Sequence, residues 1–312
     1  MNMTMLTIEK LYDLHWQDAD QTLTHLSAAS GLAVIGERFY VVADDDVHLG
    51  AFALDNALPG QRVAVFPDDL PQEKSARKKC KPDLEALLLL PPEAHFPFGS
   101  LLALGSGSTA RRRRAAQLAL DASGAIHGAP QSLDFSPLFL SLETHVVDLN
   151  IEGALVLGKQ LVLLQRGNQQ HPRSALIFCP LDSVLQFLQG TAVNFTSVLT
   201  IVDCTLPTIN GVVLSFTDGT PLPDGNILFS AVAENTADSY RDGECVGAAL
   251  GVVTPAGKIL CCQALAQPHK IEGVALHWPA GKPEILLVTD ADNPSIPAAL
   301  LRINHPMNVL HY

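Results

Sequence analysis

Apolar residues in this chain occur in short runs rich in Val, Leu and Ile, and turn residues separate the runs. Clear examples are residues 39–43, 160–164, 198–202 and 285–289. Gly, Pro, Asn and Asp punctuate them, as at Asp218-Gly219 and Asp224-Gly225. Short apolar runs bounded by such turns are typical of β-strands. Helical periodicity is scarce, and only residues 113–122 and 182–188 are candidate helices. The pattern therefore predicts an all-β chain.

The strands recur in a repeat. The clearest copies are Ile-Glu-Gly at residues 151–153 and at residues 271–273, each followed by two further apolar runs. Weaker copies place the repeat starts at residues 30, 85, 152, 210 and 272, at intervals of about 60 residues. Each unit holds three strands and a fourth before the next start, so five units fill the chain.

Four-stranded units repeated around an axis form a β-propeller. We therefore predict one domain over residues 1–312 with five four-stranded blades. The last unit lacks its own fourth strand, and residues 6–14 are expected to supply it and close the ring. Six blades are the first alternative. A two-sheet sandwich is the second, but it would not explain the recurring Glu-Gly.

The repeat position carries an oxygen-bearing side chain in every unit. The first strand of a propeller blade lines the central channel, and the loop entering it opens on one end of that channel, which we call the mouth. The five residues at this position are Ser30, Glu85, Glu152, Asn210 and Glu272. Carboxylates crowded on one axis repel each other unless a positive charge intervenes.

A divalent cation is one way to neutralise these carboxylates. Ca²⁺ takes oxygen ligands from carboxylates, amides and water, so Glu85, Glu152, Asn210 and Glu272 are the predicted metal ligands. The alternative is structural: the loops entering the strands donate hydrogen bonds to the glutamates, and arginines such as Arg166 neutralise them. Both interpretations remain open at this point.

A second candidate is the Gly/Ser turn at residues 105–109, which runs into four consecutive arginines. Backbone N–H groups, hydroxyls and guanidinium groups suit phosphate or carboxylate. Ser106, Ser108, Arg111 and Arg166 are therefore the predicted residues for a small anionic ligand. The alternative is a flexible turn followed by a solvated basic run.

Two histidines fall in loops that would face the mouth. His48 and His171 are candidate general bases, although a single loop histidine is often just exposed to solvent. The sequence holds no His-Glu-x-x-His and no Gly-x-Ser-x-Gly. Catalytic residues beyond these two candidates are therefore not indicated.

Composition and charge narrow the class of protein. Apolar residues make up 47% of the chain and the net charge is -12, which excludes a disordered chain and argues against nucleic-acid binding. The N-terminus lacks the pattern of a signal peptide, and no apolar run reaches the ~18 residues of a membrane span. The six cysteines form no Cys-x-x-Cys pair. We expect a cytoplasmic protein with reduced cysteines and no membrane partner.

Two motifs carry a resemblance to known propellers: Lys-Ile-Glu-Gly-Val-Ala at 270–275 with Leu-Leu-Val-Thr-Asp at 286–290, and Ile-Glu-Gly at 151–153. In these residues the chain resembles bacterial propellers of the esterase-like phytase type and their uncharacterised relatives. It is also distantly similar to gluconolactonase-type propellers, in which a Glu-Gly strand start provides a metal ligand. That resemblance implies Glu152 or Glu272 as the ligand and Asn210 as a neutral partner.

Two hypotheses of function follow. The first is a propeller that binds a divalent cation, a small anionic ligand or both at the mouth, and that hydrolyses phosphate esters or lactones with the metal as Lewis acid. The second is a non-catalytic propeller that binds a protein or small ligand through the same face. Since one fold hosts many functions, the sequence leaves both open.

Overall fold

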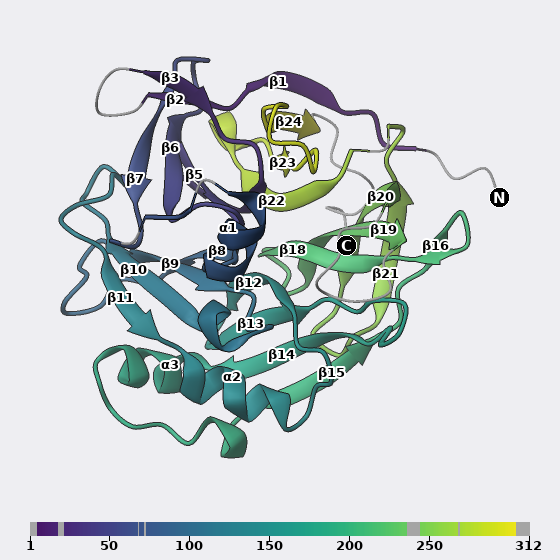
Figure 1. Ribbon diagram of the computed structural model, residues 1–312. Helices are drawn as coiled ribbons and strands as arrows, with labels where there is room; N and C mark the ends of the chain where they lie inside the picture. The colour runs from purple at the N-terminus through teal and green to yellow at the C-terminus, as the bar shows by residue number, and fades with distance from the viewer. Residues whose placement is uncertain are drawn as a thin grey trace.

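The computed structural model describes residues 5–17, 22–67, 69–71, 73–235, 244–267 and 269–303. Five sheets surround a central axis, and each forms a blade of four antiparallel strands (Figure 1). The strands follow in chain order from the axis outward, except that the N-terminal strand is the outermost strand of the last blade. The chain is therefore a five-bladed β-propeller, as the sequence predicts. The alternatives with six blades or with two packed sheets are excluded.

Each blade begins with the strand at the axis. Blade 1 has β4 (Ala29–Ile35), β5 (Arg38–Ala43), β6 (His48–Ala53) and β7 (Gly60–Ala64), extended by β2 (His15–Gln17) and β3 (Leu23–His25). Blade 2 has β8 (Leu84–Leu90), β9 (Ser100–Gly105), β10 (Arg114–Ala119) and β11 (Gln131–Asp134). Blade 3 has β12 (Ile151–Leu157), β13 (Gln160–Gln165), β14 (Ser174–Pro180) and β15 (Thr200–Cys204).

The remaining two blades complete the circle. Blade 4 has β18 (Ser215–Pro221), β19 (Ile227–Asn235), β20 (Glu244–Val253) and β21 (Ile259–Ala264). Blade 5 has β22 (Ile271–His277), β23 (Glu284–Thr289), β24 (Ala299–Ile303) and β1 (Glu9–Asp13). The N-terminal strand β1 pairs antiparallel with β24, with Asp13 opposite Ala299. The prediction that an N-terminal strand closes the ring is thus confirmed, and β24 is left without a free edge.

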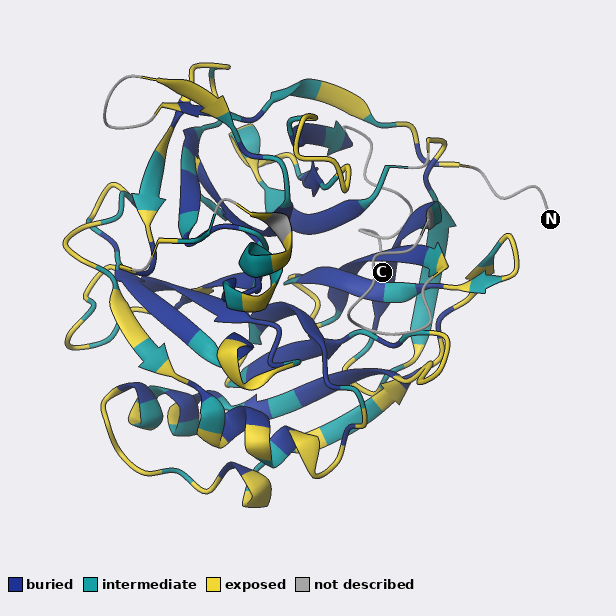
Figure 2. Cartoon of the chain, in the orientation of Figure 1, coloured by how far each residue is buried: buried dark blue, intermediate teal, exposed yellow. Residues whose placement is uncertain are grey.

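The core lies between the faces of neighbouring blades. Figure 2 shows the strands largely buried and the outer loops exposed. Blades 3 and 4 share one apolar cluster, in which Phe216 and Phe229 meet edge to face with ring centroids 5.1 Å apart. Each sheet is thus covered on both faces, which explains why its inner strands are nearly continuous apolar runs.

Helices occur only between strands. They are α1 (Lys74–Cys80), α2 (Ser136–Glu143) and α3 (Leu181–Leu188). The helix expected at residues 182–188 is confirmed as α3, but the one expected at 113–122 is wrong. That segment is strand β10, which pairs with β9 and β11, so sheet pairing overrides its local helical pattern. None of the helices in the described part is long and apolar enough to cross a bilayer.

The fourth repeat start also needs correction. Asn210 and Gly211 form the two-residue turn between β16 (Thr208–Ile209) and β17 (Val212–Val213), with φ of 51° and 81°. Asn-Gly favours this turn because both residues tolerate positive φ. Asn210 is exposed and lies in a hairpin ahead of the innermost strand, so it does not line the channel.

The true fourth repeat residue is Thr217. All five innermost strands have a register irregularity at one position relative to their neighbours. The residues at this ring position are Ser30, Glu85, Glu152, Thr217 and Glu272. Four of the five are those that the sequence predicts.

The residues that follow the ring position form a small-residue layer: Gly31, Ala86, Gly153, Asp218 and Gly273. A methyl group added at Gly31 would lie 2.5 Å from the backbone nitrogen of Leu87 on the next blade. One added at Gly153 would lie 2.8 Å from the Cα of Asp218. The innermost strands therefore approach each other so closely here that most positions allow no side chain.

Gly31→Ala should destabilise the protein, because its methyl group meets rigid backbone across the axis. We expect a loss of about 1–3 kcal/mol in the free energy of unfolding, measured by chemical denaturation. Gly219→Ala is the control, since its methyl group would meet only side-chain carbons, the nearest being Leu164 Cδ2 at 3.0 Å. Equal losses in the two variants would contradict the close approach.

Candidate functional site at the mouth of the channel

The mouth is formed by two sets of loops. One set enters the innermost strands, and the other joins the second and third strands of each blade, as at residues 44–47 and 166–173. Helix α1 leads directly into β8 and lies over this end of the axis (Figure 1). Charged side chains from all five blades therefore meet at the mouth.

Arg166 connects three blades on one side of the mouth. Its guanidinium lies 3.0 Å from Glu152 on β12 and 3.9 Å from Glu272 on β22, and it also pairs with Glu234 on β19. Asn150 donates a hydrogen bond of 2.5 Å to Glu152. Glu152 and Glu272 are thus neutralised in the way that the structural alternative expects.

Lys270 continues this network toward blade 5. Its ammonium lies 3.4 Å from Glu272, 3.8 Å from Asp290 and 2.6 Å from Asp292. The lysine side chain is only 11% exposed. One lysine ahead of β22 therefore holds the β23–β24 loop against the ring carboxylates.

Lys81 and Arg112 form the network on the other side. Lys81, which follows α1, pairs with Asp44 and lies 2.8 Å from Asp83. Arg112 lies 2.8 Å from Asp83. Asp83 also accepts a hydrogen bond of 2.6 Å from the Ser106 hydroxyl. The Asp83 carboxylate thus contacts Lys81, Arg112 and Ser106. The backbone of Asp83 has a left-handed φ of 58°.

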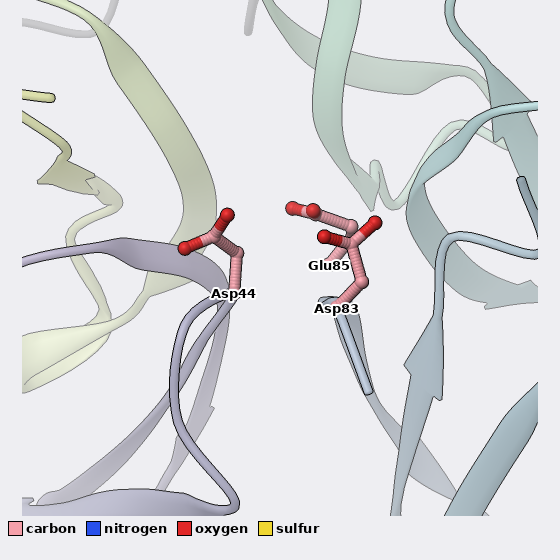
Figure 3. A group of neighbouring side chains, drawn as sticks. All are labelled: Asp44, Asp83 and Glu85. Carbon is pink, nitrogen blue, oxygen red and sulfur yellow. The ribbon is translucent and has the colours of Figure 1, made fainter. Parts of the chain in front are cut away.

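Glu85 has no such donor. It lies beside Asp83 and opposite Asp44 (Figure 3), and one carboxylate oxygen of each lies within 4.8 Å of the others. No described residue donates a hydrogen bond to the Glu85 carboxylate. Burial, reinforced by the charges of Glu152, Asp83 and Asp44, raises the pKa of Glu85 well above its usual range.

Carboxylates outnumber cations in this network. Lys81, Arg112, Arg166 and Lys270 pair with seven carboxylates of the described part, and Glu85 is an eighth. Burial raises the pKa of Glu272 to about 8, although Lys270 and Arg166 oppose the shift. Burial likewise raises the pKa of Asp290 to about 8. Burial therefore favours the neutral form of these two carboxyls, and the neighbouring cations oppose this.

A cavity of about 350 Å³ opens beside this network. It lies between blades 1 and 5 and α1, and both carboxylates and cations line it. Among them are Asp44, Asp290, Arg77, Lys81 and Lys270. Arg77 on α1 donates a hydrogen bond of 2.8 Å to the backbone oxygen of Asp45. The helix is thus attached over the cavity by polar contacts.

The predicted anion-binding residues lie in two places. Ser106 and Ser108 are linked by hydroxyl groups 2.9 Å apart, and Arg112 donates to Ser108 at 3.0 Å. Ser106 and Arg112 bind the carboxylate of Asp83, which belongs to the same chain. Arg111 is exposed, while Arg166 belongs to the glutamate network described above.

The two histidines lie away from the ring carboxylates. His48 Nδ1 is 2.8 Å from Asp46, and Asp46 is 2.8 Å from Arg62. His171 is exposed in the β13–β14 loop. Neither is brought next to Glu85 or to the cavity lining.

The sequence reasoning missed the residues that complete the site. Thr217 was hidden because Asp218-Gly219 resembles a turn, whereas both residues lie inside β18. The tighter Asp224-Gly225 turn after β18 is the signal that could have located the strand. Lys81 and Lys270 precede the innermost strands β8 and β22, but they lie four and two residues before the ring position, so the repeat does not align them.

Asp218 is the one acidic residue of the small-residue layer. It is 1% exposed, and its Oδ2 accepts a hydrogen bond of 2.9 Å from the backbone of Val274, while Oδ1 has no partner. Burial raises the pKa of this carboxyl well above its usual range. Asp218 therefore fills the space that the glycines leave on the axis.

Arg166→Met should be strongly destabilising, because it leaves Glu152 buried without its ion-pair partner and removes the nearer cation from Glu234, whose other cation, Lys270, lies 3.9 Å away. We expect a loss of about 3–5 kcal/mol in the free energy of unfolding, measured by denaturant titration. Arg173→Met is the matched control: its pair with Asp203 is exposed, so its loss should stay below about 1 kcal/mol. Similar losses would show that the network adds little.

Stability should fall as the pH rises toward 9. Glu272 and Asp290 keep their protons to about pH 8 in the folded protein but lose them near their ordinary pKa in the unfolded chain. Their contribution is complete in acid and is lost as the pH passes about 8. The Tm, followed from about pH 5 to 9, should decline less in Asp290→Asn than in the unaltered protein. Asp203→Asn should leave the slope unchanged.

Known structures share the fold with this chain. A glutaminyl cyclase from Myxococcus xanthus has a TM-score of 0.50 and 11% identity, over 96% of this chain and 97% of that one. A luciferin-regenerating enzyme has a TM-score of 0.47 and 10% identity, over 96% and 95%. The WD40 propeller domain of Doa1 has a TM-score of 0.42 and 8% identity, over 96% and 98%. At such identities the similarity concerns the fold alone.

The sequence comparisons identify a family without a known activity. No curated protein sequence matches the chain. Residues 25–304, from the start of blade 1 to the last described strand, match a family of unknown function, DUF6929. This match spans all five blades, and the chain therefore belongs to the family of unknown function DUF6929.

Proposed function

We propose that the mouth binds a divalent cation, with Ca²⁺ as the first candidate, through Asp44, Asp83 and Glu85. The observation that carries this proposal is the convergence of their carboxylates, with oxygens within 4.8 Å of one another. Ca²⁺ binds oxygen at 2.3–2.6 Å, so two of its ligands lie at most ~5 Å apart. The three side chains come from the neighbouring blades 1 and 2, so they converge only when these two blades pack together.

Lys81 is the competitor for this cation. Its ammonium pairs with Asp44 and Asp83 and so supplies one positive charge to the cluster. No described residue donates a hydrogen bond to Glu85, and the single charge of Lys81 does not neutralise all three carboxylates. A divalent ion would offset two of the three carboxylate charges, one more than Lys81 does, and it would move Lys81 toward the adjacent cavity.

The adjacent cavity suits a small anionic ligand. Arg77, Lys81 and Lys270 line it, and guanidinium and ammonium groups bind phosphate and carboxylate. A cation at Glu85 would polarise an ester or acyl oxygen of such a ligand. We propose hydrolysis of phosphate esters or lactones as the reaction class, in line with the resemblance to phytase-type and gluconolactonase-type propellers.

A non-catalytic role is the second candidate. Asp83 already forms ion pairs with Lys81 and Arg112 and accepts a hydrogen bond from Ser106. This arrangement favours a permanent structural role for the network. In that case the mouth binds a protein or small ligand through its polar rim. The two candidates differ in whether a metal changes the stability of the protein.

The test is a titration of the metal-free protein with Ca²⁺, Mg²⁺ and Mn²⁺, followed by Tm and by calorimetry. At about 100 times its Kd, the bound ion should add about 2.7 kcal/mol to the free energy of unfolding. Glu85→Gln should weaken binding at least about tenfold, a cost of about 1.4 kcal/mol. Lys81→Met should lower the Tm without metal and tighten metal binding, since the competing ammonium is gone.

Asp203→Asn is the control, because Asp203 is an exposed carboxylate on β15 outside the mouth. It should bind metal as the unaltered protein does. If no cation changes the Tm of either the unaltered protein or Lys81→Met, the metal site is refuted and the non-catalytic role stands. If metal binds, esters and lactones are the substrates to screen, with Glu85→Gln as the inactive reference.

A further inference from the structure

A second cavity, of about 250 Å³, lies on the axis on the other side of the small-residue layer. Three consecutive residues of every innermost strand line it: 32–34, 87–89, 154–156, 219–221 and 274–276. They are the second to fourth residues after the ring position in all five blades. Unlike the mouth, this cavity has no charged residue in its lining.

The small-residue layer separates this apolar cavity from the mouth. At this level Gly31 and Gly153 bring β4 against β8 and β12 against β18. Asp218, which directly precedes the lining residue Gly219, fills the space between the strands. The polar and apolar halves of the channel are therefore distinct sites.

The apolar cavity opens at the end opposite the mouth. On β8, Leu87 is 2% exposed, Leu88 3% and Leu89 42%. The same gradient holds on β12, where Ala154 is buried and Val156 is partly exposed, and on β22 between Val274 and Leu276. Three residues of strand span about 10 Å. The cavity is a blind apolar well with its rim in solvent.

We propose that this well binds the alkyl chain of a small amphiphile, whose polar head remains at the rim. Apart from Thr220, which is partly exposed, the lining side chains offer water no hydrogen-bond partner, and apolar cavities of ~150 Å³ stay dry and take up small apolar molecules. The volume here is larger, and the depth of three strand residues suits a chain that enters end on. Leu89 and Pro221 at the rim would contact the chain where it leaves the well.

The position of the ligand's polar head follows from the absence of charged residues in the lining of the well. A hydroxyl or carboxylate at the buried end of the ligand would lose its water without gaining a partner, which is costly. At the rim the head stays hydrated. This site is independent of the cation at the mouth, since the small-residue layer lies between them.

The experiment measures binding of hexanol and hexanediol to the full chain by ligand-observed NMR. Hexanol should bind saturably. Hexanediol has the same chain but must bury a second hydroxyl, and it should bind at least about tenfold more weakly. Equal binding of the two, or no saturable binding of hexanol, would overturn the proposal.

Ala154→Leu tests the location, because the larger side chain fills the deep part of the well. It should weaken hexanol binding at least about tenfold, whereas the control Ala119→Leu, on the partly exposed end of β10, should not. Unchanged binding in Ala154→Leu would place the alcohol elsewhere and refute the site. Should this variant fail to fold, Ala275→Val, with a smaller addition in the same well, replaces it. Metal titration of the same samples distinguishes failure here from failure at the mouth.

Discussion

The close approach of the five innermost strands is the constraint on which the other features of this propeller depend. Gly31 and Gly153 let one backbone contact the next across the axis, so the ring closes tightly enough for each sheet to be covered on both faces. The pairing of β1 with β24 then covers the outer edge of β24 and supplies the fourth strand of blade 5. A side chain at the small-residue layer would hold the blades apart, and both the channel and the inter-blade cores would change.

This layer also determines the chemistry of the channel. Glu152 and Glu272 of the ring lie directly beside it and are buried. Their pKa values rise, and cations are recruited from the loops: Arg166 bridges three blades, and Lys81 ties the end of α1 to Asp44 and Asp83. Carboxylates still outnumber basic side chains at the mouth, and this excess makes the mouth a candidate cation site. The other half of the channel, without any charge, is left to apolar ligands.

The repeat could be predicted because the physical reason for it is local. Strands covered on both faces must be apolar throughout, and the turns between them need Gly, Asn, Asp or Pro, so blades leave a regular pattern. The ring positions Ser30, Glu85, Glu152 and Glu272 could be predicted directly from this pattern. The error at Asn210 has the same local origin: Asn-Gly marks a turn, and an Asp-Gly inside β18 resembles another. Two competing turn signals left the register of blade 4 undetermined until its sheet pairing was known.

The sequence by itself determined the all-β class, the five units, the closing strand and most of the residues that line the axis. Only the tertiary structure decided which charges meet. Three ion pairs join segments that are far apart in the sequence: Lys81 with Asp44, Arg166 with Glu234 on β19, and Lys270 with Asp292. Nothing in their spacing along the chain brings them together. The serine and arginine turn offered an anion site, and its occupant proved to be Asp83 from the same blade. The short apolar runs and the turns that mark the strands are local in sequence, whereas the ion pairs and the two cavities depend on how five separate sheets pack around one axis.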